Sequence, residues 1–309
     1  MRIVDNVDLD IAGGEALGLV GESGCGKSVL ARSALGLLPR RLFQVRGSAL
    51  LDDRDLVAMT RRQLRGVLGR KVAMIFQEPA TAMDPVYPSG DAAYEVLRRH
   101  RGQSRAQAWA GVEDLFARVG IDDPGTRCRQ IPARLSGGMR QRALIASSIA
   151  SEVELLVADE PTTALDVTIQ AQILALINRL RRDLGTAVLL ITHDFGVVAS
   201  TCDRVAVMYA GRIVELGTVD ELFNSPAHPY TRLLLDALRS MDAGARFELT
   251  GIAGTVPSPG AWPAGCRFHP RCPDRFEPCG SIEPRDIPLP QRRGRVACHK
   301  WDPQYGGRA

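Results

Sequence analysis

The chain has 309 residues, of which 45% are hydrophobic and 24% charged, so it is long enough to fold around one or two hydrophobic cores. This composition excludes a disordered, fibrous or small disulfide-stabilised protein. The formal net charge of +4 is too small to indicate nucleic-acid binding, and no apolar run reaches the roughly 18 residues that a membrane helix needs. The first residues carry charge and lack a signal-peptide pattern.

Short apolar segments alternate with helical stretches up to about residue 225. The apolar segments bounded by Gly, Asp or Pro are predicted as buried strands: Ala16–Val20, Val72–Phe76, Leu155–Asp159 and Ala187–Thr192. The predicted helices are Lys27–Leu37, Asp91–Arg101, Ala106–Val119 and Thr168–Leu184. A hairpin is predicted from Arg204–Tyr209 and Arg212–Glu215. Strands that alternate with helices indicate an α/β fold with a mainly parallel sheet.

A glycine-rich loop follows the first predicted strand and fits the pattern G-x-x-x-x-G-K-[ST]. Its backbone N–H groups and the start of the next helix are suited to bind phosphate. Lys27 can reach the β- and γ-phosphates of a nucleotide, and Ser28 can bind Mg²⁺. The Cys25 thiol lies beside these amides, so we expect a lowered pKa there. The residues predicted to bind nucleotide here are Gly21, Glu22, Ser23, Gly24, Cys25, Gly26, Lys27, Ser28 and Val29.

Two carboxylates end the predicted strand Leu155–Asp159, at the strand edge where α/β sheets bind ligands. Asp159 is predicted to hold Mg²⁺, directly or through water. Glu160 is predicted to be the general base that polarises the attacking water.

Further motifs stand in a fixed order around these two. Gln77 follows one predicted strand within Phe76-Gln77-Glu78-Pro79, and His193 follows another within Ile191-Thr192-His193-Asp194. Ser136 opens the segment Ser136-Gly137-Gly138-Met139-Arg140-Gln141, where it can cap the following helix. The sequence LLVADEPT ends at Thr162, and Ala164-Leu165-Asp166 follows one residue later. Together with the glycine-rich loop, this order resembles the ATP-binding subunit of ATP-binding-cassette (ABC) transporters.

The resemblance implies a P-loop NTPase core with a mainly parallel sheet and a helical subdomain over about residues 80–145. It also implies that two such domains pair head to tail, with two ATP molecules between them. Ser136, Gly137, Gly138 and Gln141 would then face the nucleotide of the partner domain. Gln77 would sense Mg²⁺ and the attacking water, and Asp166 would link the two sites. His193 would contact the γ-phosphate, so the implied catalytic residues are Glu160, His193 and Gln77.

The C-terminal part has a different composition, with nine prolines between Pro257 and Pro290. That density excludes long helices and central strands. The segment Ser225–Thr231 and an apolar helix over Leu233–Leu238 resemble the oligopeptide/dipeptide branch of importers, which includes nickel relatives. We therefore expect an ABC nucleotide-binding domain over residues 1–225 and a small Pro/Cys-rich C-terminal extension over residues 226–309.

Four cysteines lie in this extension, at Cys266-x5-Cys272-x6-Cys279-x18-Cys298. The spacing differs from ordinary zinc ribbons and from common ferredoxin runs. Four thiolates in a segment with little core are suited to a metal that stabilises it. The resemblance points to a [4Fe–4S] cluster. A four-cysteine zinc site and free or disulfide-linked cysteines are the alternatives.

The resemblance also implies partners and a location. The partners are a second ATPase subunit of similar or identical sequence, two transmembrane permease subunits and, indirectly, an external substrate-binding protein. The location is peripheral, on the cytoplasmic face of the cell membrane. A soluble ABC protein acting on nucleic acid is disfavoured, because basic blocks with interleaved aromatics are absent from the sequence.

The sequence is also compatible with two alternative functions. One is an importer ATPase for nickel or another small solute, because the substrate pocket lies in other chains. The other is a structural subunit that binds nucleotide and hydrolyses it weakly. The second alternative is motivated by the N-terminal sequence: in most relatives an aromatic residue on a further strand stacks on adenine, whereas no aromatic residue precedes Gly21 here.

Overall fold

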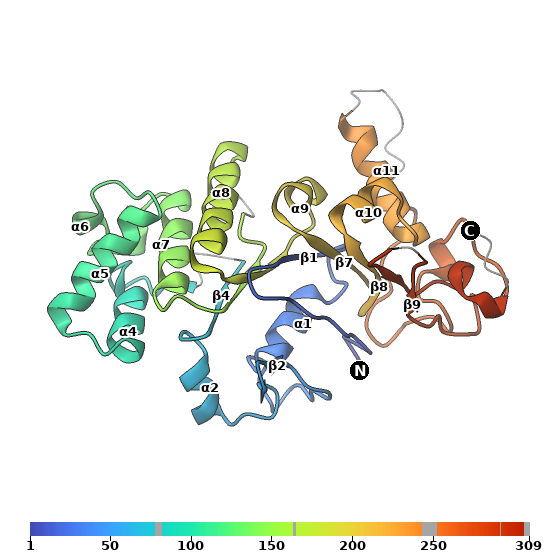
Figure 1. Ribbon diagram of the computed structural model, residues 1–309, viewed down its shortest axis with the longest axis horizontal. Helices are drawn as coiled ribbons and strands as arrows, with labels where there is room; N and C mark the ends of the chain where they lie inside the picture. The colour runs from blue at the N-terminus through green and yellow to red at the C-terminus, as the bar shows by residue number, and fades with distance from the viewer. Residues whose placement is uncertain (78–81, 163–164, 243–251, 291, 306–309) are drawn as a thin grey trace. The chain divides into compact units, whose positions relative to one another are not determined.

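The computed structural model describes residues 1–77, 82–162, 165–242, 252–290 and 292–305 (Figure 1). The chain forms two compact units. One unit comprises Met1–Asp10, Leu17–Arg32 and Thr192–Ala309, and the other comprises Ile11–Ala16 and Ser33–Ile191. The first unit therefore takes in both the glycine-rich loop and the C-terminal extension.

The unit that contains Ser33–Ile191 is built on parallel strands. β5 (Leu155–Asp159) pairs with β4 (Val72–Ile75) on one side and β6 (Ala187–Ile191) on the other. The long helix α8 (Val167–Leu184) connects β5 to β6 and buries one apolar face. It ends at Gly185, whose φ of +65° is the left-handed conformation that commonly terminates helices.

A group of helices lies between β4 and β5 in the chain. It comprises α4 (Asp91–His100), α5 (Arg105–Arg118), α6 (Pro124–Arg127) and α7 (Gly137–Ile149), with a short 3₁₀ helix η1 at Pro132–Arg134. Figure 1 shows α4, α5 and α7 side by side, and these helices contact one another. The same unit contains the short strands β2 (Leu50–Leu51) and β3 (Arg54–Asp55) and the helix α2 (Arg61–Val67), which the sequence analysis did not predict.

The unit that contains both chain ends has a mixed sheet. β1 (Ala16–Val20) pairs in parallel with β7 (Arg204–Tyr209), which forms a hairpin with β8 (Arg212–Thr218). Beyond β8 follow the antiparallel strands β10 (Arg295–Val296) and β9 (Ile287–Pro288). The helices of this unit include α1 (Lys27–Ala34), α9 (Phe195–Thr201), α10 (Val219–Asn224) and α11 (Pro229–Asp242).

The aromatic core of this unit joins the sheet to the C-terminal extension. Tyr209 of β7, Tyr230 of α11 and Phe268 of the extension are each at most 1% exposed. Their ring centroids lie 4.7 to 5.2 Å apart in edge or tilted contacts. Because aromatic rings bury large areas, this cluster contributes to the apolar attachment of the extension.

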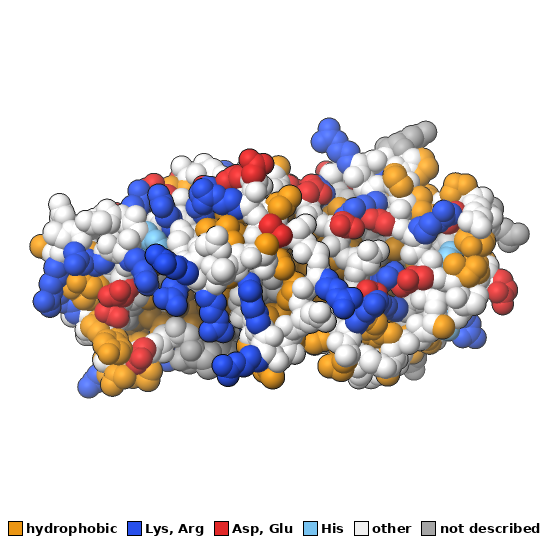
Figure 2. All heavy atoms as spheres, turned by 90° about the horizontal axis from the view of Figure 1, so that it is seen from below, with side chains coloured by type: hydrophobic (Ala, Val, Ile, Leu, Met, Phe, Trp, Pro, Cys, Tyr) orange, Lys and Arg blue, Asp and Glu red, His pale blue; other side chains and the backbone are white. Residues whose placement is uncertain are grey.

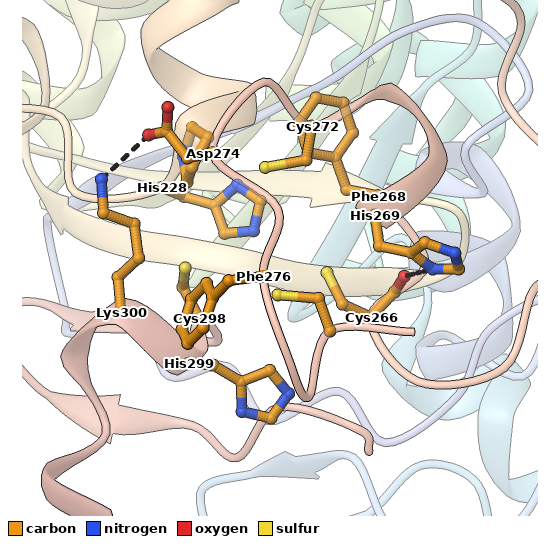
Figure 3. Close-up of a pocket in the computed structure, with 12 residues that line it drawn as sticks. His228, Cys266, Phe268, His269, Cys272, Asp274, Phe276, Cys298, His299 and Lys300 are labelled. Atoms are coloured by element: carbon orange, nitrogen blue, oxygen red, sulfur yellow. Dashed lines mark hydrogen bonds and ion pairs between the residues drawn. The ribbon is translucent and has the colours of Figure 1, made fainter. Parts of the chain in front are cut away.

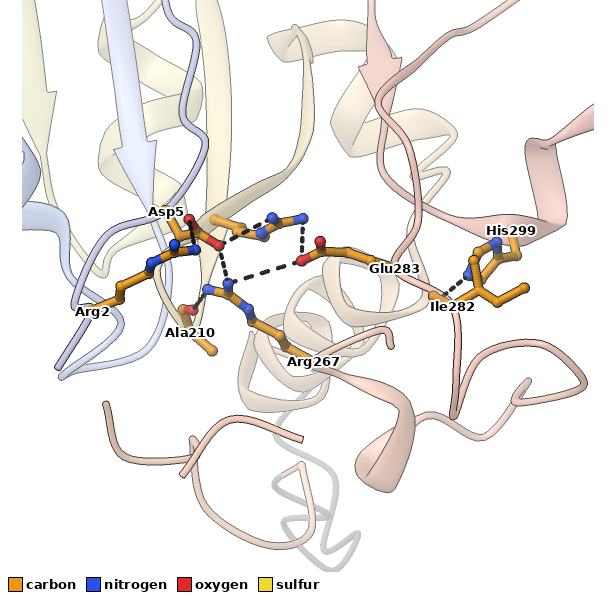
Figure 4. Close-up of polar contacts among 8 residues, drawn as sticks. Arg2, Asp5, Ala210, Arg267, Ile282, Glu283 and His299 are labelled. Carbon is orange, nitrogen blue, oxygen red and sulfur yellow. Dashed lines mark hydrogen bonds and ion pairs between the residues drawn. The ribbon is translucent and has the colours of Figure 1, made fainter. Parts of the chain in front are cut away.

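Charged groups hold the N-terminal segment in the same unit (Figure 4). The Asp5 carboxylate accepts hydrogen bonds from Arg212 at 3.1 Å and from Arg267 at 2.5 Å. Arg267 also donates to the Ala210 carbonyl oxygen at 2.6 Å, and its side chain is 8% exposed. The Glu283 carboxylate lies 2.6 Å from Arg212, and Arg2 lies 3.2 Å from Asp5, so three guanidinium groups share two carboxylates.

The proline-rich segment is mostly irregular, as its composition predicts. Its regular pieces are the two-residue strands β9 and β10 and the 3₁₀ helices η2 (His269–Arg271), η3 (His299–Trp301) and η4 (Pro303–Tyr305). None of the helices in the described ranges combines the length and apolar character needed to span a bilayer. On the face drawn in Figure 2, basic side chains are interspersed with acidic and hydrophobic ones.

Candidate functional site

The glycine-rich loop connects β1 to α1, as the sequence predicts. Gly21 has a φ of +151°, and a Cβ there would lie 2.1 Å from the Met208 carbonyl oxygen. Gly26 has a φ of +109°, in the region that side chains rarely adopt. Glycine is therefore required at both positions for the backbone to curl between the strand and the helix.

Lys27 lies in the first turn of α1 and is only 5% exposed. Its ammonium group donates to the carbonyl oxygens of Gly21 at 2.7 Å and Glu22 at 3.2 Å. It also lies 3.8 Å from the Cys25 sulfur. These three partners are uncharged. A buried ammonium group held only by neutral groups in the described part of the chain favours an anionic ligand. The loop is thus chemically suited to phosphate.

The environment of Cys25 corrects one expectation. The thiol is 1% exposed, and burial raises its pKa, although the nearby Lys27 charge acts in the opposite direction. The expected lowered pKa is therefore wrong, because removal from water outweighs the favourable amides and the ammonium. Cys25 is a buried packing residue in this conformation.

Gln77 and Glu160 meet in the other unit. Glu160 follows β5, and its N–H donates to the Ile191 carbonyl oxygen at 2.9 Å. Its carboxylate accepts a hydrogen bond from Gln77 Nε2 at 2.7 Å. Asp159, the last residue of β5, is fully buried. The structure therefore brings together two of the three predicted catalytic residues, while Glu78-Pro79 of the same motif lie outside the described residues.

Of the remaining predicted residues in this unit, Ser136 and Asp166 cap helices, and Gln141 is buried within α7. Ser136 caps α7, accepting from the Met139 N–H at 3.3 Å, as predicted. Asp166 caps α8, accepting from the Ile169 N–H at 2.9 Å. Gln141 is 1% exposed, and its amide nitrogen has no hydrogen-bond partner in the described part of the chain. The motif residues Thr163 and Ala164 lie outside the described residues.

His193 lies in the same unit as the glycine-rich loop. It is exposed and lies two residues after the end of β6, next to Asp194. Asp194 caps α9 by accepting from two backbone N–H groups at 2.8 and 3.2 Å. The Asp194 N–H donates to the Thr192 hydroxyl at 3.0 Å. This turn holds the backbone around His193 and leaves its ring at the surface.

The four cysteines of the extension line one pocket (Figure 3). In Figure 3 the Cys266, Cys272 and Cys298 side chains point toward a shared space. Burial raises the pKa of Cys266 to about 11 and that of Cys298 to about 12, and the neighbouring thiols add to both shifts. None of the four forms a disulfide.

The donor set of this pocket suits a soft metal, because four thiols face one cavity. Within the ranges that the structure describes, however, no group of three or more His, Cys, Asp or Glu side chains is arranged to hold a metal ion. The structure therefore supports the gathering of the cysteines and leaves a bound metal as a proposal.

Two residues near the glycine-rich loop were not predicted from the sequence. Tyr230 and Arg271, both from the C-terminal part of the chain, hydrogen-bond to Glu22 of the loop. An arginine among the many of this chain carries no local signal that it reaches a phosphate loop, so sequence reasoning had no means to select it.

Comparisons with known proteins agree with these features. A family model described as "ABC transporter" matches residues 4–163, and one described as "Oligopeptide/dipeptide transporter, C-terminal region" matches residues 214–279. The chain is 46% identical, over 92% of its length and 85% of the relative, to the dipeptide transport ATP-binding protein DppD of Bacillus subtilis. It is 49% identical, over 90% of its length and 83% of the relative, to a probable peptide ABC transporter ATP-binding protein, y4tR, of Sinorhizobium fredii.

Solved structures share the fold. The dimeric ATP-binding cassette MJ0796, in a post-hydrolysis state bound to ADP and Pi, gives a TM-score of 0.63 at 24% identity over 70% of this chain and 90% of that one. The chain cbiO1 from Clostridium perfringens, part of the ABC transporter complex cbiONQ, gives 0.61 at 25% identity over 78% and 90%. The chain therefore belongs to the ATP-binding subunits of ABC transporters, a family of ATPases. Within that family it carries the C-terminal region of oligopeptide/dipeptide transporters.

Proposed function

We propose that this chain hydrolyses ATP to energise the import of oligopeptides or dipeptides through an ABC transporter. The observation that carries the proposal is the combination of an ABC segment at residues 4–163 with an oligopeptide/dipeptide C-terminal region at residues 214–279. Relatives named as dipeptide or peptide transport ATP-binding proteins are similar over nine tenths of the chain.

In this proposal the residues Gly21–Val29 bind the nucleotide phosphates through backbone N–H groups and the Lys27 ammonium. Glu160 polarises the attacking water, and the 2.7 Å hydrogen bond from Gln77 orients its carboxylate. His193 contacts the γ-phosphate. Catalysis then consists of positioning and electrostatic stabilisation, as in other phosphoryl transfers.

Ser28, Asp159 and Gln77 are proposed to hold Mg²⁺. Asp159 supplies the carboxylate for it at the end of β5, and Ser28 supplies a hydroxyl at the start of α1. The ion would neutralise charge on the phosphate oxygens. Oxygen ligands of this kind fit magnesium better than softer metals.

We also propose that two ATPase domains pair head to tail, so that Ser136, Gly137, Gly138 and Gln141 serve the partner's nucleotide and Asp166 links the two sites. Similar dimeric cassettes among the solved structures support pairing. The proposed domains are residues 1–225 for the nucleotide-binding domain, with its helical subdomain at about 80–145, and residues 226–309 for the extension. The other proposed partners are two permease subunits and an external binding protein, with the chain on the cytoplasmic face of the membrane.

The cysteine pocket is proposed to hold a [4Fe–4S] cluster on Cys266, Cys272, Cys279 and Cys298, with zinc as the alternative. Four thiols on one small pocket support the proposal, since such ligands favour both metals. Iron, acid-labile sulfide and zinc content of anaerobically purified chain test it. About four iron and four sulfide per chain are expected for this cluster type. Zinc alone supports the alternative, and a folded chain without either metal removes both.

A transport assay tests the function. The chain would be co-purified with its two permease subunits and binding protein and reconstituted into liposomes. We expect ATP hydrolysis to rise when peptides of two to five residues are added, and to be lost in Glu160→Gln. Stimulation by a nickel chelate without stimulation by peptides would support the small-solute alternative. Nucleotide binding without turnover in the complete assembly would support the structural subunit.

A further inference from the structure

Glu22, the second residue of the glycine-rich loop, is held from two directions by the C-terminal part of the chain. Its backbone N–H donates to the Tyr230 hydroxyl oxygen at 3.0 Å. Its carboxylate accepts two hydrogen bonds from the Arg271 guanidinium, at 2.7 and 2.9 Å. Backbone and side chain of one loop residue are thus fixed by residues that follow it by 208 and 249 positions.

The Arg271 guanidinium is itself fixed in one orientation. Its side chain is 7% exposed, and its other N–H groups donate to the Tyr209 hydroxyl at 3.3 Å and to the carbonyl oxygens of Ile252 and Ala253 at 3.0 and 2.9 Å. The hydrogen bonds to Glu22 raise the pKa of Arg271 above its ordinary value. Exposed ion pairs contribute little to stability. The pair of Arg271 and Glu22 differs from them, because it is bidentate and mostly buried and because further hydrogen bonds fix the guanidinium.

The segment that carries Arg271 also forms a wall of the cysteine pocket. Arg271 ends the 3₁₀ helix η2, and Cys272 follows it directly. Phe268, one turn earlier, lines the pocket and contacts the rings of Tyr209 and Tyr230, both at 5.2 Å between centroids. One short segment therefore contacts the pocket on one side and the residues that hold the glycine-rich loop on the other.

We propose that Arg271 is a positioning residue for nucleotide binding: its pair with Glu22 fixes the glycine-rich loop in the binding conformation and makes the extension a determinant of nucleotide affinity. The inference rests on the proposed role of Gly21–Val29 in binding phosphate. A loop that is already ordered pays less conformational entropy on binding, so a released loop binds more weakly. A charged hydrogen bond of ordinary strength corresponds to about a tenfold change in affinity.

The test measures MgADP binding to the full-length chain by titration calorimetry. Arg271→Met is expected to weaken binding about tenfold. Arg271→Lys is expected to fall between Met and wild type, because an ammonium keeps the charge but loses the bidentate geometry. Arg285→Met is the control for loss of an arginine–carboxylate pair elsewhere in the extension: the Arg285 side chain is 68% exposed and lies 2.9 and 3.2 Å from the Asp302 carboxylate oxygens, and we expect unchanged binding.

A double-mutant cycle separates the pair from a general structural effect. Glu22→Gln removes the charge and keeps an acceptor, so it tests the pair even if Arg271→Met folds poorly. If the two groups act together, the double variant Glu22→Gln/Arg271→Met binds no more weakly than Arg271→Met alone. Fully additive losses would overturn the proposal. Amide hydrogen exchange over residues 21–28 of the nucleotide-free chain is expected to rise in Arg271→Met and to stay unchanged in Arg285→Met.

Lys27→Ala distinguishes this inference from the proposed site. If Lys27→Ala abolishes binding while Arg271→Met and Glu22→Gln bind like wild type, the positioning role is wrong and the site stands. If Lys27→Ala binds MgADP like wild type, the proposed role of the loop itself is wrong.

Discussion

The Glu160 side chain is directed by an unusual backbone conformation. Its φ of +48° lies in the left-handed region, which non-glycine residues adopt rarely and at a cost of order 1 kcal/mol or more. The N–H bond to Ile191 and the carboxylate bond to Gln77 hold it there. Such strain persists only where surrounding contacts impose it, which agrees with a carboxylate whose direction matters for chemistry.

Glu160→Gln is expected to slow ATP turnover by about 10²- to 10⁴-fold, because the amide cannot act as a general base. The side chain keeps its size, so MgATP affinity should change little. Steady-state hydrolysis by the reconstituted transporter and nucleotide titration measure the two effects. Glu154→Gln, which alters a carboxylate paired with Lys71 at 2.8 Å and 47% exposed, should leave turnover unchanged. Equal turnover in Glu160→Gln and wild type would exclude Glu160 as the base.

Cys25 is expected to resist alkylation in the native chain, since its thiol is 1% exposed and burial raises its pKa. Mass spectrometry after brief iodoacetamide treatment would compare it with Cys202, which is partly exposed. We expect Cys202 to be labelled first and Cys25 only after urea unfolding. Labelling of both thiols at the same rate would contradict the buried environment.

For single residues, the sequence predicts which residue types bind phosphate better than it predicts how buried a side chain is. The motif G-x-x-x-x-G-K-[ST] specifies Gly21, Gly26 and Lys27 because backbone sterics and phosphate charge dictate those residue types. The state of the Cys25 thiol depends on what covers the loop. That covering comes from β7 and from the segment after it: the Gly211 N–H donates to the Cys25 carbonyl oxygen at 2.8 Å. Local pattern contains no information about such a contact.

Among the secondary-structure elements, helix caps combine structure and proposed function. Asp166 caps α8 and is also proposed to link two nucleotide sites. Asp166→Ala should lower the free energy of unfolding by about 1 kcal/mol, while Asp166→Asn, which also caps well, should lower it by only a few tenths. Urea unfolding of both variants measures this. Loss of activity in Asp166→Asn with stability retained would assign a role to the charge, and equal destabilisation by Asn and Ala would contradict the capping geometry.

The elements that the sequence predicted well have strong boundaries. The predicted strands Ala16–Val20 and Leu155–Asp159 agree with β1 and β5 to the residue, because glycine or acidic residues end both apolar runs. The short β2, β3 and α2 were missed, since two to seven residues give too little periodicity to recognise. α11 begins at Pro229, four residues before the predicted Leu233, because proline suits the first helical turn.

At the scale of the whole molecule, the extension is held by contacts that span most of the sequence. Tyr230 and Arg271 reach Glu22, and Arg267 reaches Asp5, 262 positions away. The density of proline between Pro257 and Pro290 predicted the absence of long helices, and the described residues of that segment form none. The extension has a small apolar cluster of its own around Ala227, Leu289 and Val296. Which residues attach it could not be predicted, because the partners are single side chains brought together only by the folded sheet.

Asp5 offers a test of this long-range attachment through pH. Burial raises the pKa of Asp5, but hydrogen bonds and charges from Arg212 and Arg267 outweigh that effect and hold the pKa below its ordinary value of 3.8. A carboxyl with a lowered pKa in the fold stabilises it above the unfolded pKa, and this contribution is lost as the pH falls through the folded value. Asp5→Asn should therefore be less stable than wild type at pH 7 and pH 5.

The expected loss at pH 7 is about 2 kcal/mol, the strength of hydrogen bonds between charged groups, because Arg267 keeps its charge at 8% exposure without the carboxylate. Urea unfolding at pH 7, 5 and 3.5 measures it, with the exposed pair of Arg204 and Asp10 as control through Asp10→Asn. The difference in the free energy of unfolding between wild type and Asp5→Asn should be the same at pH 7 and 5 and begin to shrink at pH 3.5. A difference that grows as the pH falls, or one no larger than that of Asp10→Asn, would mean that the Asp5 network does not hold the N-terminal segment to the extension.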